Sequence, residues 1–396
     1  MKHTFPLLLC LWLSVGATAQ WRPRPDAFPP EPEAIDSKSI LMASTVEEMA
    51  SWDRYPTYET YLAMMSRWAE EFPTLCRVDT IGESVQGRLI LSMYIEGEEL
   101  GEKPGFFYSS TIHGDEVTGY VMMLRLIDTL LHGYGSNPQY TSLINRTRIS
   151  INPLANPDGT YWRGNQTIRG AQRYNANGVD LNRNYPDPFA PAKAGIPQEN
   201  QAMIDYFQRR HFRLSANLHG GAEVMNYPWD SFTSEENPHP YADWWTAVGR
   251  RFVDTTRVYD NSHFRDVPEA DDGVVAGGDW YVIDGGRQDY VNAALNCLEI
   301  TMELSTTKML PVERLNEYWG FLQHSLVNYI EEIHSLPEGM GIATAHGQEM
   351  KVYPNPTTGR VTVRGEKGEY SFDLSPLKAG VYLIPVEGKT AKVIKL

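Results

Sequence analysis

The 396-residue sequence is poor in cysteine, in basic residues and in long apolar runs. It has three cysteines, and one of them, Cys10, lies in the short apolar run near the start of the chain. The other two, Cys76 and Cys297, are too few to form a disulfide framework in a domain of this size, and neither has a second cysteine at metal-ligand spacing. A single bridge between them is compatible with the sequence, but we expect two buried free thiols.

Positive charge is also scarce. Lys and Arg together number 35 against 50 Asp and Glu, which gives a formal net charge of −15. Nucleic-acid binding needs concentrated positive charge, so this composition argues against a nucleic-acid partner. A net charge of this size fits an exported protein that its own charge keeps in solution.

The sequence offers one short apolar run near its start and no run that predicts a membrane span. Residues 7–15 are apolar, but a spanning helix needs about 20 such residues. Lys2 and His3 precede the run, and the small-x-small tripeptide at residues 17–19 follows it. This order predicts a signal peptide over residues 1–20, and hence an exported protein that is secreted or held at the cell surface.

Composition divides the remainder of the chain. Residues 21–50 form a proline-rich leader, residues 51–336 have a globular texture, residues 337–350 read as a linker, and residues 351–396 form a small β-rich appendage. In the globular part, apolar periodicity predicts helices over 58–72, 116–131, 199–211 and 315–330. Strands are expected over 88–95, 105–112 and 213–218, with another ending near residue 303. The alternation predicts the α/β class, with a mixed, mostly parallel sheet flanked by helices.

Three side chains near predicted strand ends are suited to a metal. His113 and Glu116 lie three residues apart at a strand-to-helix turn, and His219 closes a later strand before Gly220 and Gly221. A His-x-x-Glu pair alone is weak evidence, because a Glu at a helix start is favoured by the helix dipole. Two imidazoles and one carboxylate together, however, leave one position open, which is typical of a catalytic zinc.

Other charged residues are candidates for acid–base and anion-binding roles. Glu303 lies near the end of an apolar strand and could serve as a general base. Arg173 and Arg183 could each bind a carboxylate or an oxyanion, because a guanidinium fork matches those groups. For each of these residues considered alone, a side chain that simply faces water is the more common interpretation.

These motifs, in this order, resemble the zinc carboxypeptidase family typified by pancreatic carboxypeptidase A. Residues 215–221 (Ser-Ala-Asn-Leu-His-Gly-Gly), 226–230 (Asn-Tyr-Pro-Trp-Asp) and 180–187 (Asp-Leu-Asn-Arg-Asn-Tyr-Pro-Asp) resemble the regulatory branch that includes carboxypeptidases N, E, M and D. The similarity spans roughly residues 55–335. It implies a carboxypeptidase A-like fold, one Zn²⁺ per chain, and peptide or protein C-termini as substrates.

The resemblance also implies a role for individual residues. Metal ligands are His113, Glu116 and His219, with Glu303 as the catalytic base and Arg173 as the group that holds the oxyanion. Asp180 matches the carboxylate that orients the first zinc histidine. Substrate contacts fall on Asn182, Arg183 and Tyr281, the first two at the terminal carboxylate.

Specificity is implied by two further positions. Asp230 matches an acidic residue in the pocket for the substrate's C-terminal side chain, and Gln288 matches the other pocket position. A carboxylate there favours C-terminal Lys or Arg. An inward-facing Arg287 would neutralise it, but we expect Arg287 to point to solvent, because a buried cation near the substrate's charge is costly.

The appendage resembles the C-terminal sorting domain of type IX secretion, on the strength of residues 351–359 (Lys-Val-Tyr-Pro-Asn-Pro-Thr-Thr-Gly) and 377–382 (Leu-Lys-Ala-Gly-Val-Tyr). This implies export through the periplasm, with the export machinery reading both termini. A transthyretin-like β-sandwich is the alternative for this segment. For the main domain, the alternatives are a carboxypeptidase of cell-wall peptides and an aspartoacylase-like zinc amidohydrolase.

Overall fold

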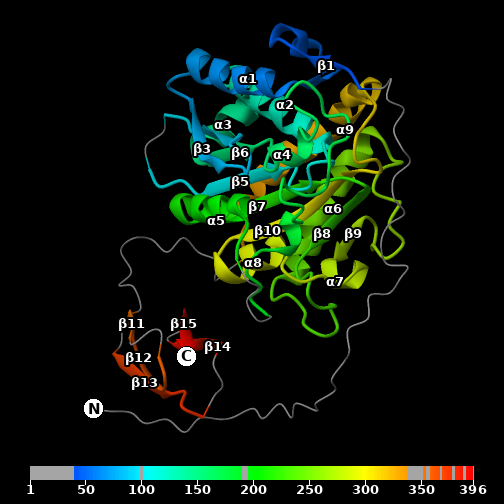
Figure 1. Cartoon of the computed structure of the whole chain (residues 1–396). Helices are drawn as coiled ribbons and strands as arrows, with labels where there is room; N and C mark the ends of the chain where they lie inside the picture. The colour runs from blue at the N-terminus through cyan, green and yellow to red at the C-terminus, as the bar shows by residue number, and fades with distance from the viewer. Residues whose placement is uncertain are drawn as a thin grey trace. The chain divides into compact units, whose positions relative to one another are not determined.

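The computed structural model describes residues 40–98, 101–189, 195–337, 351–353, 357–365, 368–376, 380–386 and 389–395 (Figure 1). The chain divides into two compact units, Met1–Ser335 and Leu336–Leu396. The expected signal peptide, most of the proline-rich leader and most of the expected linker lie outside the described residues. Within the described ranges, no helix combines the length and apolarity that a membrane span requires.

A mixed sheet of eight strands forms the centre of the first unit, in the order β3-β4-β6-β5-β7-β10-β8-β9. The middle strands β6, β5, β7 and β10 run parallel, whereas β4 pairs antiparallel with both β3 and β6. β8 pairs antiparallel with β10 and parallel with β9. The predicted mixed α/β class is therefore confirmed. The strand bounds are Cys76–Glu83 (β3), Leu89–Ile95 (β4), Gly105–Ser110 (β5), Arg148–Asn152 (β6), Phe212–His219 (β7), Ala222–Tyr227 (β8), Val274–Ala276 (β9) and Leu298–Ser305 (β10).

Helices cover both faces of this sheet, because its central strands are apolar on both sides. Phe107 of β5 packs against Phe207 of α5, whereas its neighbour Phe106 packs against Tyr329 of α9 on the other face. The helix bounds are Tyr58–Glu71 (α1), Thr118–Gly133 (α2), Pro138–Arg146 (α3), Pro157–Thr160 (α4), Gln198–Arg210 (α5), Ala242–Tyr259 (α6), Gly277–Trp280 (α7), Arg287–Ala294 (α8) and Leu315–Glu331 (α9), with short 3₁₀ turns at Glu47–Ser51 (η2), Leu181–Arg183 (η3), Val312–Arg314 (η4) and Glu332–His334 (η5).

The chain preceding α1 belongs to the packed unit from residue 40 onward. Strand β1 (Met42–Ala43) pairs with β2 (Tyr55–Pro56), and Met49 of η2 is buried. Thr57 then caps α1, because its hydroxyl accepts a hydrogen bond from the Thr60 N–H at 3.2 Å. Cys76 and Cys297 are both buried free thiols, as expected.

The second unit contains two small antiparallel sheets. One is formed by β11 (Lys351–Tyr353), β12 (Arg360–Arg364) and β13 (Glu369–Asp373), and the other by β14 (Gly380–Val386) and β15 (Lys389–Lys395). A cluster of four buried residues, Val361, Val363, Leu374 and Val393, forms its core. A core this small provides limited stabilisation.

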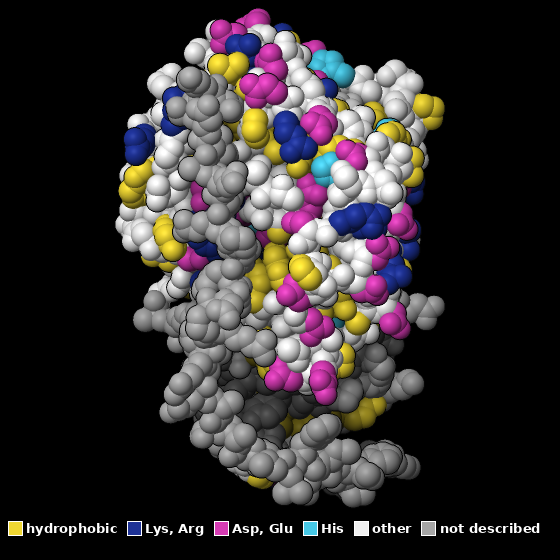
Figure 2. Space-filling model, turned by 90° about the vertical axis from the view of Figure 1, so that its right-hand side faces the viewer, with side chains coloured by type: hydrophobic (Ala, Val, Ile, Leu, Met, Phe, Trp, Pro, Cys, Tyr) yellow, Lys and Arg dark blue, Asp and Glu magenta, His cyan; other side chains and the backbone are white. Residues whose placement is uncertain are grey.

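Charged side chains on the surface are mostly acidic on the face that Figure 2 shows. Asp and Glu side chains are spread over this face from its top to its lower part, and Lys and Arg form smaller groups in its upper and middle parts (Figure 2). This distribution is consistent with the net charge of −15.

Candidate metal centre and active site

Three neighbouring parallel strands bring the candidate site together. β5, β7 and β10 lie side by side, and the candidate metal ligands and the candidate base lie near their carboxyl ends or just beyond. His113 follows the end of β5, His219 is the last residue of β7, and Glu303 of β10 is paired in register with His219. Open α/β sheets collect ligands at this edge, so the topology itself accounts for the convergence.

His113, Glu116 and His219 form a compact buried group. Their ligand atoms all lie within 4.8 Å of one another. The Glu116 carboxylate lies 2.9 Å from His113 Nδ1 through Oε1 and 2.8 Å from His219 Nδ1 through Oε2, and the two Nδ1 atoms are 3.2 Å apart. Two imidazole nitrogens and a carboxylate that face one point are a donor set suited to Zn²⁺, so the residues present fit that cofactor.

Asp180 lies behind the first histidine. Its Oδ1 is 3.3 Å from His113 Nε2, and its Oδ2 accepts a hydrogen bond from Arg173 Nε at 2.9 Å. Burial alone would raise the pKa of the Asp180 carboxyl, but its hydrogen bond to His113 and the charge of Arg173 hold that pKa well below its usual value. An ionised Asp180 favours the ring tautomer that leaves His113 Nδ1 free for a metal.

The loop that carries His113 and Glu116 is supported by the turn at residues 156–159, which the sequence presented only as a turn. Asn156 Nδ2 donates to the Ile112 carbonyl at 3.2 Å, and Thr160 Oγ1 donates to the Gly114 carbonyl at 2.9 Å. A Cβ atom on Gly114 would lie 2.4 Å from the backbone of Gly159. Glycine at position 114 therefore allows the close approach that holds His113 and Glu116 in place.

Glu303 is buried, with 8% of its surface exposed, and its Oε2 has no hydrogen-bond partner among the described residues. Burial and, second, the nearby Glu116 carboxylate raise the pKa of Glu303 well above its usual value. A cation at the histidine group would act in the opposite direction and favour the carboxylate. A buried carboxyl with a raised pKa at this position is suited to proton transfer.

The residues expected to hold the oxyanion and to contact the substrate lie near the same centre. Arg173 Nη1 lies 3.1 Å from His113 Nδ1, which places its guanidinium at the edge of the metal group. Arg183 and Asn182 belong to η3, immediately after Asp180, whose side chain caps that turn by accepting from the Asn182 N–H at 3.0 Å. Tyr281 directly follows α7, and burial, with a further contribution from Glu303, raises the pKa of its phenol.

Asp230 and Gln288 form a buried polar pair. Gln288 Nε2 donates to Asp230 Oδ1 at 2.8 Å and to Asn226 Oδ1 at 3.1 Å. Gly277 permits this packing, because a Cβ atom there would lie 2.0 Å from Asp230 Oδ1. Burial and then the neighbouring Asp289 carboxylate raise the pKa of Asp230 well above its usual value, so an incoming cation would favour its ionised form.

The expectation for Arg287 is wrong. Its side chain is fully buried rather than solvent-facing, and its guanidinium pairs with Glu299 at 2.8 and 3.0 Å. The rings of Phe107 and Phe207 lie 5.6 and 5.5 Å from the same guanidinium. A buried cation is tolerated here because it has its own carboxylate partner, and removing either would leave an uncompensated charge. Glu299 therefore neutralises the charge of Arg287.

Sequence reasoning missed several residues around the site. Asn217 Nδ2 lies 2.8 Å from His219 Nε2, and Asp289 accepts the backbone N–H groups of Asp230 and Ser231. Lys308 Nζ lies 3.1 Å from Asp115 and 3.8 Å from Glu116. Asn217 could have been found, because alternation along a strand places it on the same side as His219. The other two contacts join segments that are distant in sequence.

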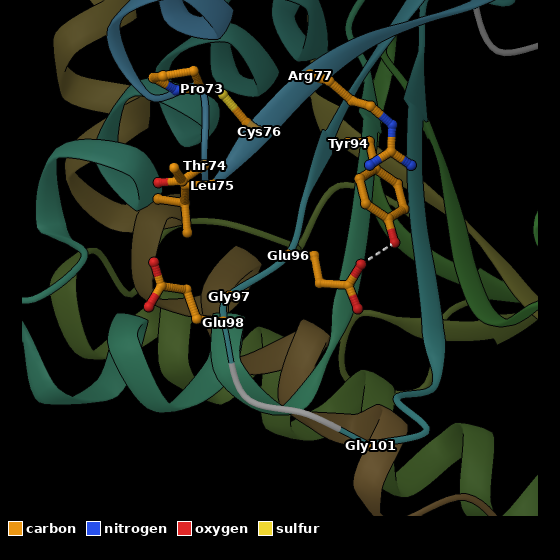
Figure 3. Close-up of a pocket in the computed structure, with 10 residues that line it drawn as sticks. All are labelled: Pro73, Thr74, Leu75, Cys76, Arg77, Tyr94, Glu96, Gly97, Glu98 and Gly101. Atoms are coloured by element: carbon orange, nitrogen blue, oxygen red, sulfur yellow. Dashed lines mark hydrogen bonds between the residues drawn. The ribbon is translucent and has the colours of Figure 1, made fainter.

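A separate hollow of about 370 Å³ lies at the edge of the sheet and contains none of these residues (Figure 3). There the Arg77 guanidinium lies 3.7 Å from the centre of the Tyr94 ring, and the Tyr94 hydroxyl donates to Glu96. The lining residues are Pro73, Thr74, Leu75, Cys76, Arg77, Tyr94, Glu96, Gly97, Glu98 and Gly101.

The fold and the site together define a metallohydrolase on a mixed α/β sheet, with a His₂Glu group beside a buried carboxyl. A model of the zinc carboxypeptidase family, peptidase M14, matches residues 61–321. The chain belongs to this family, whose cofactor is zinc.

Named relatives agree with this assignment. The chain is 35% identical over 287 residues to carboxypeptidase D of Anas platyrhynchos, covering 68% of this chain and 20% of that protein. It is 33% identical over 323 residues to carboxypeptidase M of Mus musculus, covering 76% and 70%. The chain thus spans about a fifth of the length of the carboxypeptidase D relatives.

Solved structures share the fold. The structure of thrombin activatable fibrinolysis inhibitor matches with a TM-score of 0.63 at 16% identity, covering 74% of this chain and 78% of that one. Carboxypeptidase A from Helicoverpa armigera matches with a TM-score of 0.61 at 21% identity, covering 74% and 76%. At these identities the match concerns the fold alone.

Proposed function

We propose that this chain is a metallocarboxypeptidase that removes C-terminal Lys or Arg from peptides or proteins. The observation that carries the proposal is the register of β7 and β10, in which Glu303 is paired with His219 of the buried His₂Glu group. Glu303 Oε2 has no hydrogen-bond partner among the described residues. A base next to a metal group is the arrangement that peptide-bond hydrolysis requires. Arg183 lies three residues after Asp180 in the sequence. Its guanidinium can bind a free terminal carboxylate, so the proposed enzyme is an exopeptidase.

The chain's own residues divide the proposed reaction between them. His113, Glu116 and His219 would hold zinc, which supplies Lewis-acid chemistry that makes water acidic near neutral pH and polarises a carbonyl. Glu303 takes the proton of the attacking water and later delivers it to the leaving amine. Arg173 stabilises the negative charge that develops on the carbonyl oxygen, Asp180 orients His113, and Asn182 with Arg183 positions the substrate's carboxylate. Tyr281 closes over the substrate.

The preference for basic residues rests on Asp230. Its carboxyl is buried beside Gln288 and Asp289, and burial disfavours its charged form. A Lys or Arg side chain that enters the pocket would supply the opposite charge and a charge-assisted hydrogen bond, worth about 1.5–3 kcal/mol. An apolar side chain would supply neither. Because Glu299 already pairs with Arg287, that arginine does not compete for Asp230.

Substrate specificity is tested with blocked dipeptides that differ only in their C-terminal residue. We expect substrates ending in Arg or Lys to exceed those ending in Phe or Leu in kcat/KM by at least about tenfold, since one such hydrogen bond is worth that much. Asp230→Ala should remove this margin, and Asp284→Ala, which changes an exposed acid on the loop before α8, should keep it. A native preference for Phe or Glu would contradict the specificity and leave the metal chemistry intact.

We also propose that the protein is exported and that residues 351–396 act as a sorting domain of the type IX kind. The support is the signal-like sequence at residues 1–20 and the motifs of the C-terminal unit, whose described residues form short antiparallel strands. In the native cell, deletion of 351–396 should leave the enzyme in the periplasm, measured by fractionation with periplasmic and cytosolic marker proteins as leakage controls. Secretion of the truncated chain at the normal level would rule out this role.

A further inference from the structure

A second group of metal-ligand side chains lies away from the catalytic centre, where the end of α6 meets the start of α9. It consists of Asp260, His263 and Glu317, whose ligand atoms all lie within 4.8 Å of one another. The helices α6 and α9 pack against each other, so these three residues are brought together by tertiary structure. None of the three takes part in the proposed reaction.

One nitrogen of the His263 ring contacts a buried carboxylate. Its Nδ1 lies 2.8 Å from both oxygens of Glu223, a residue of β8 that is 4% exposed. Glu223 is fixed in turn by the Tyr318 hydroxyl at 3.0 Å and the Phe264 N–H at 3.1 Å, both of which donate to it. Because a carboxylate bound by donors is an acceptor, His263 Nδ1 carries the hydrogen.

The other ring nitrogen is buried and has no hydrogen-bond partner among the described residues. His263 is 5% exposed, and its Nε2 points toward Asp260 Oδ2 at 3.4 Å. The second Asp260 oxygen, Oδ1, accepts from the Ser262 hydroxyl at 2.7 Å and the Ser262 N–H at 2.9 Å, which lowers the pKa of Asp260. His263 Nε2 therefore faces the Asp260 carboxylate with no hydrogen bond formed, and either a proton on the ring or a cation between the two atoms would satisfy both groups.

Glu317 completes the group from the first turn of α9. Its oxygens accept from Arg314 at 3.0 and 3.2 Å, and the side chains of Arg314 and Glu317 are 40% and 49% exposed. Exposed pairs of this kind contribute little to stability, so Glu317 can exchange Arg314 for a stronger partner at small cost. The competing arginine makes this group a weaker ligand set than the buried catalytic one.

We propose that Asp260, His263 and Glu317 form a second divalent-cation site, with Glu223 as the outer partner that sets the His263 tautomer. One imidazole nitrogen and two carboxylate oxygens are a donor set that suits Zn²⁺. A metal-bound histidine commonly donates its other ring N–H to a carboxylate, and Glu223 occupies that place. A cation here joins α6 to α9 and, through Glu223, to β8, and so stabilises the fold without entering the reaction.

The test is a calorimetric titration of the metal-stripped full chain with ZnCl₂. Elemental analysis of the chain after dialysis against a low concentration of zinc gives an independent count of bound metal. The native chain should bind two equivalents, the second more weakly than the first. Asp260→Asn and Glu317→Gln, which change partly exposed residues, should bind one equivalent and keep normal hydrolysis. Asp271→Asn, a matched exposed acid that pairs with Arg250 of α6, should still bind two.

Two further variants examine the ring itself. His263→Gln should lose the second equivalent, and Glu223→Gln should weaken it by about 10–100-fold, the usual effect of removing an outer partner. Zinc should also raise the Tm of the native chain more than that of Asp260→Asn, because binding to the folded state alone adds stability. One equivalent in the native chain, or two in Asp260→Asn and Glu317→Gln, would overturn the proposal and leave at most an adventitious ion.

Discussion

Glu303→Gln should lower kcat by roughly 10³-fold or more while the protein keeps its fold and its zinc. The amide has nearly the same size as the carboxyl but cannot accept the proton of water, so both the base role and the later acid role are lost. The site tolerates the change, because Glu303 Oε2 has no hydrogen-bond partner to lose among the described residues. Single-turnover kinetics on a dipeptide ending in Arg, with metal analysis of the same sample, measures the effect.

The matched control for this variant is Glu313→Gln, which makes the same chemical change at an exposed position in η4. It should leave kcat within about twofold of the native value, since surface changes away from the site have small effects. If Glu303→Gln retained near-normal turnover with zinc bound, Glu303 would not be the base, although the metal site would stand.

Removal of the catalytic metal should abolish hydrolysis. The three ligands are buried, and their Glu116 carboxylate is held ionised by the two histidines against the effect of burial, so the group provides no comparable electrophile without a cation. Dialysis against a chelator should reduce kcat/KM to the background rate, and the first equivalent of Zn²⁺ should restore it, because the catalytic group is the stronger ligand set.

His113→Ala provides the control for nonspecific effects of the chelator. It should be inactive at one equivalent of zinc and keep the native circular dichroism spectrum, because the change removes a ligand at the sheet edge and leaves the apolar core intact. Full activity of the native chain after exhaustive metal removal would contradict the assignment of this centre as a metal site.

Much of the architecture could be predicted from local patterns. Helices expected at 58–72 and 199–211 are observed at Tyr58–Glu71 and Gln198–Arg210, and the strand expected at 213–218 is observed at Phe212–His219. The helix expected from residue 116 begins at Thr118, because Glu116 is still in the turn that faces His219. Periodicity predicts the type of an element well, whereas contacts at its ends decide the boundary.

The site was predictable to the extent that its chemistry is carried by short motifs. His113, Glu116, His219 and Glu303 lie at or near the ends of predicted strands, and parallel strands place their carboxyl ends at one edge. The resemblance then related Arg173, Asp180 and Asp230 to the same centre. Gly114 and the turn at 156–159 were not expected to matter to it, because their role is a close backbone approach between two loops.

Charge pairing across the fold was decided only by the tertiary structure. The cost of burying a cation led to the expectation of a solvent-facing Arg287, yet β10 carries Glu299 beside it and the two charges are buried together. The same holds for Glu223 and His263. They lie 40 residues apart in the sequence and meet because Glu223 of β8 contacts the loop that follows α6. Local sequence determines which residues share a strand or a helix face, since those periods are set by the backbone. Which buried charge meets which depends on how the sheet orders its strands, and that order minimises the free energy of the whole chain rather than of any segment.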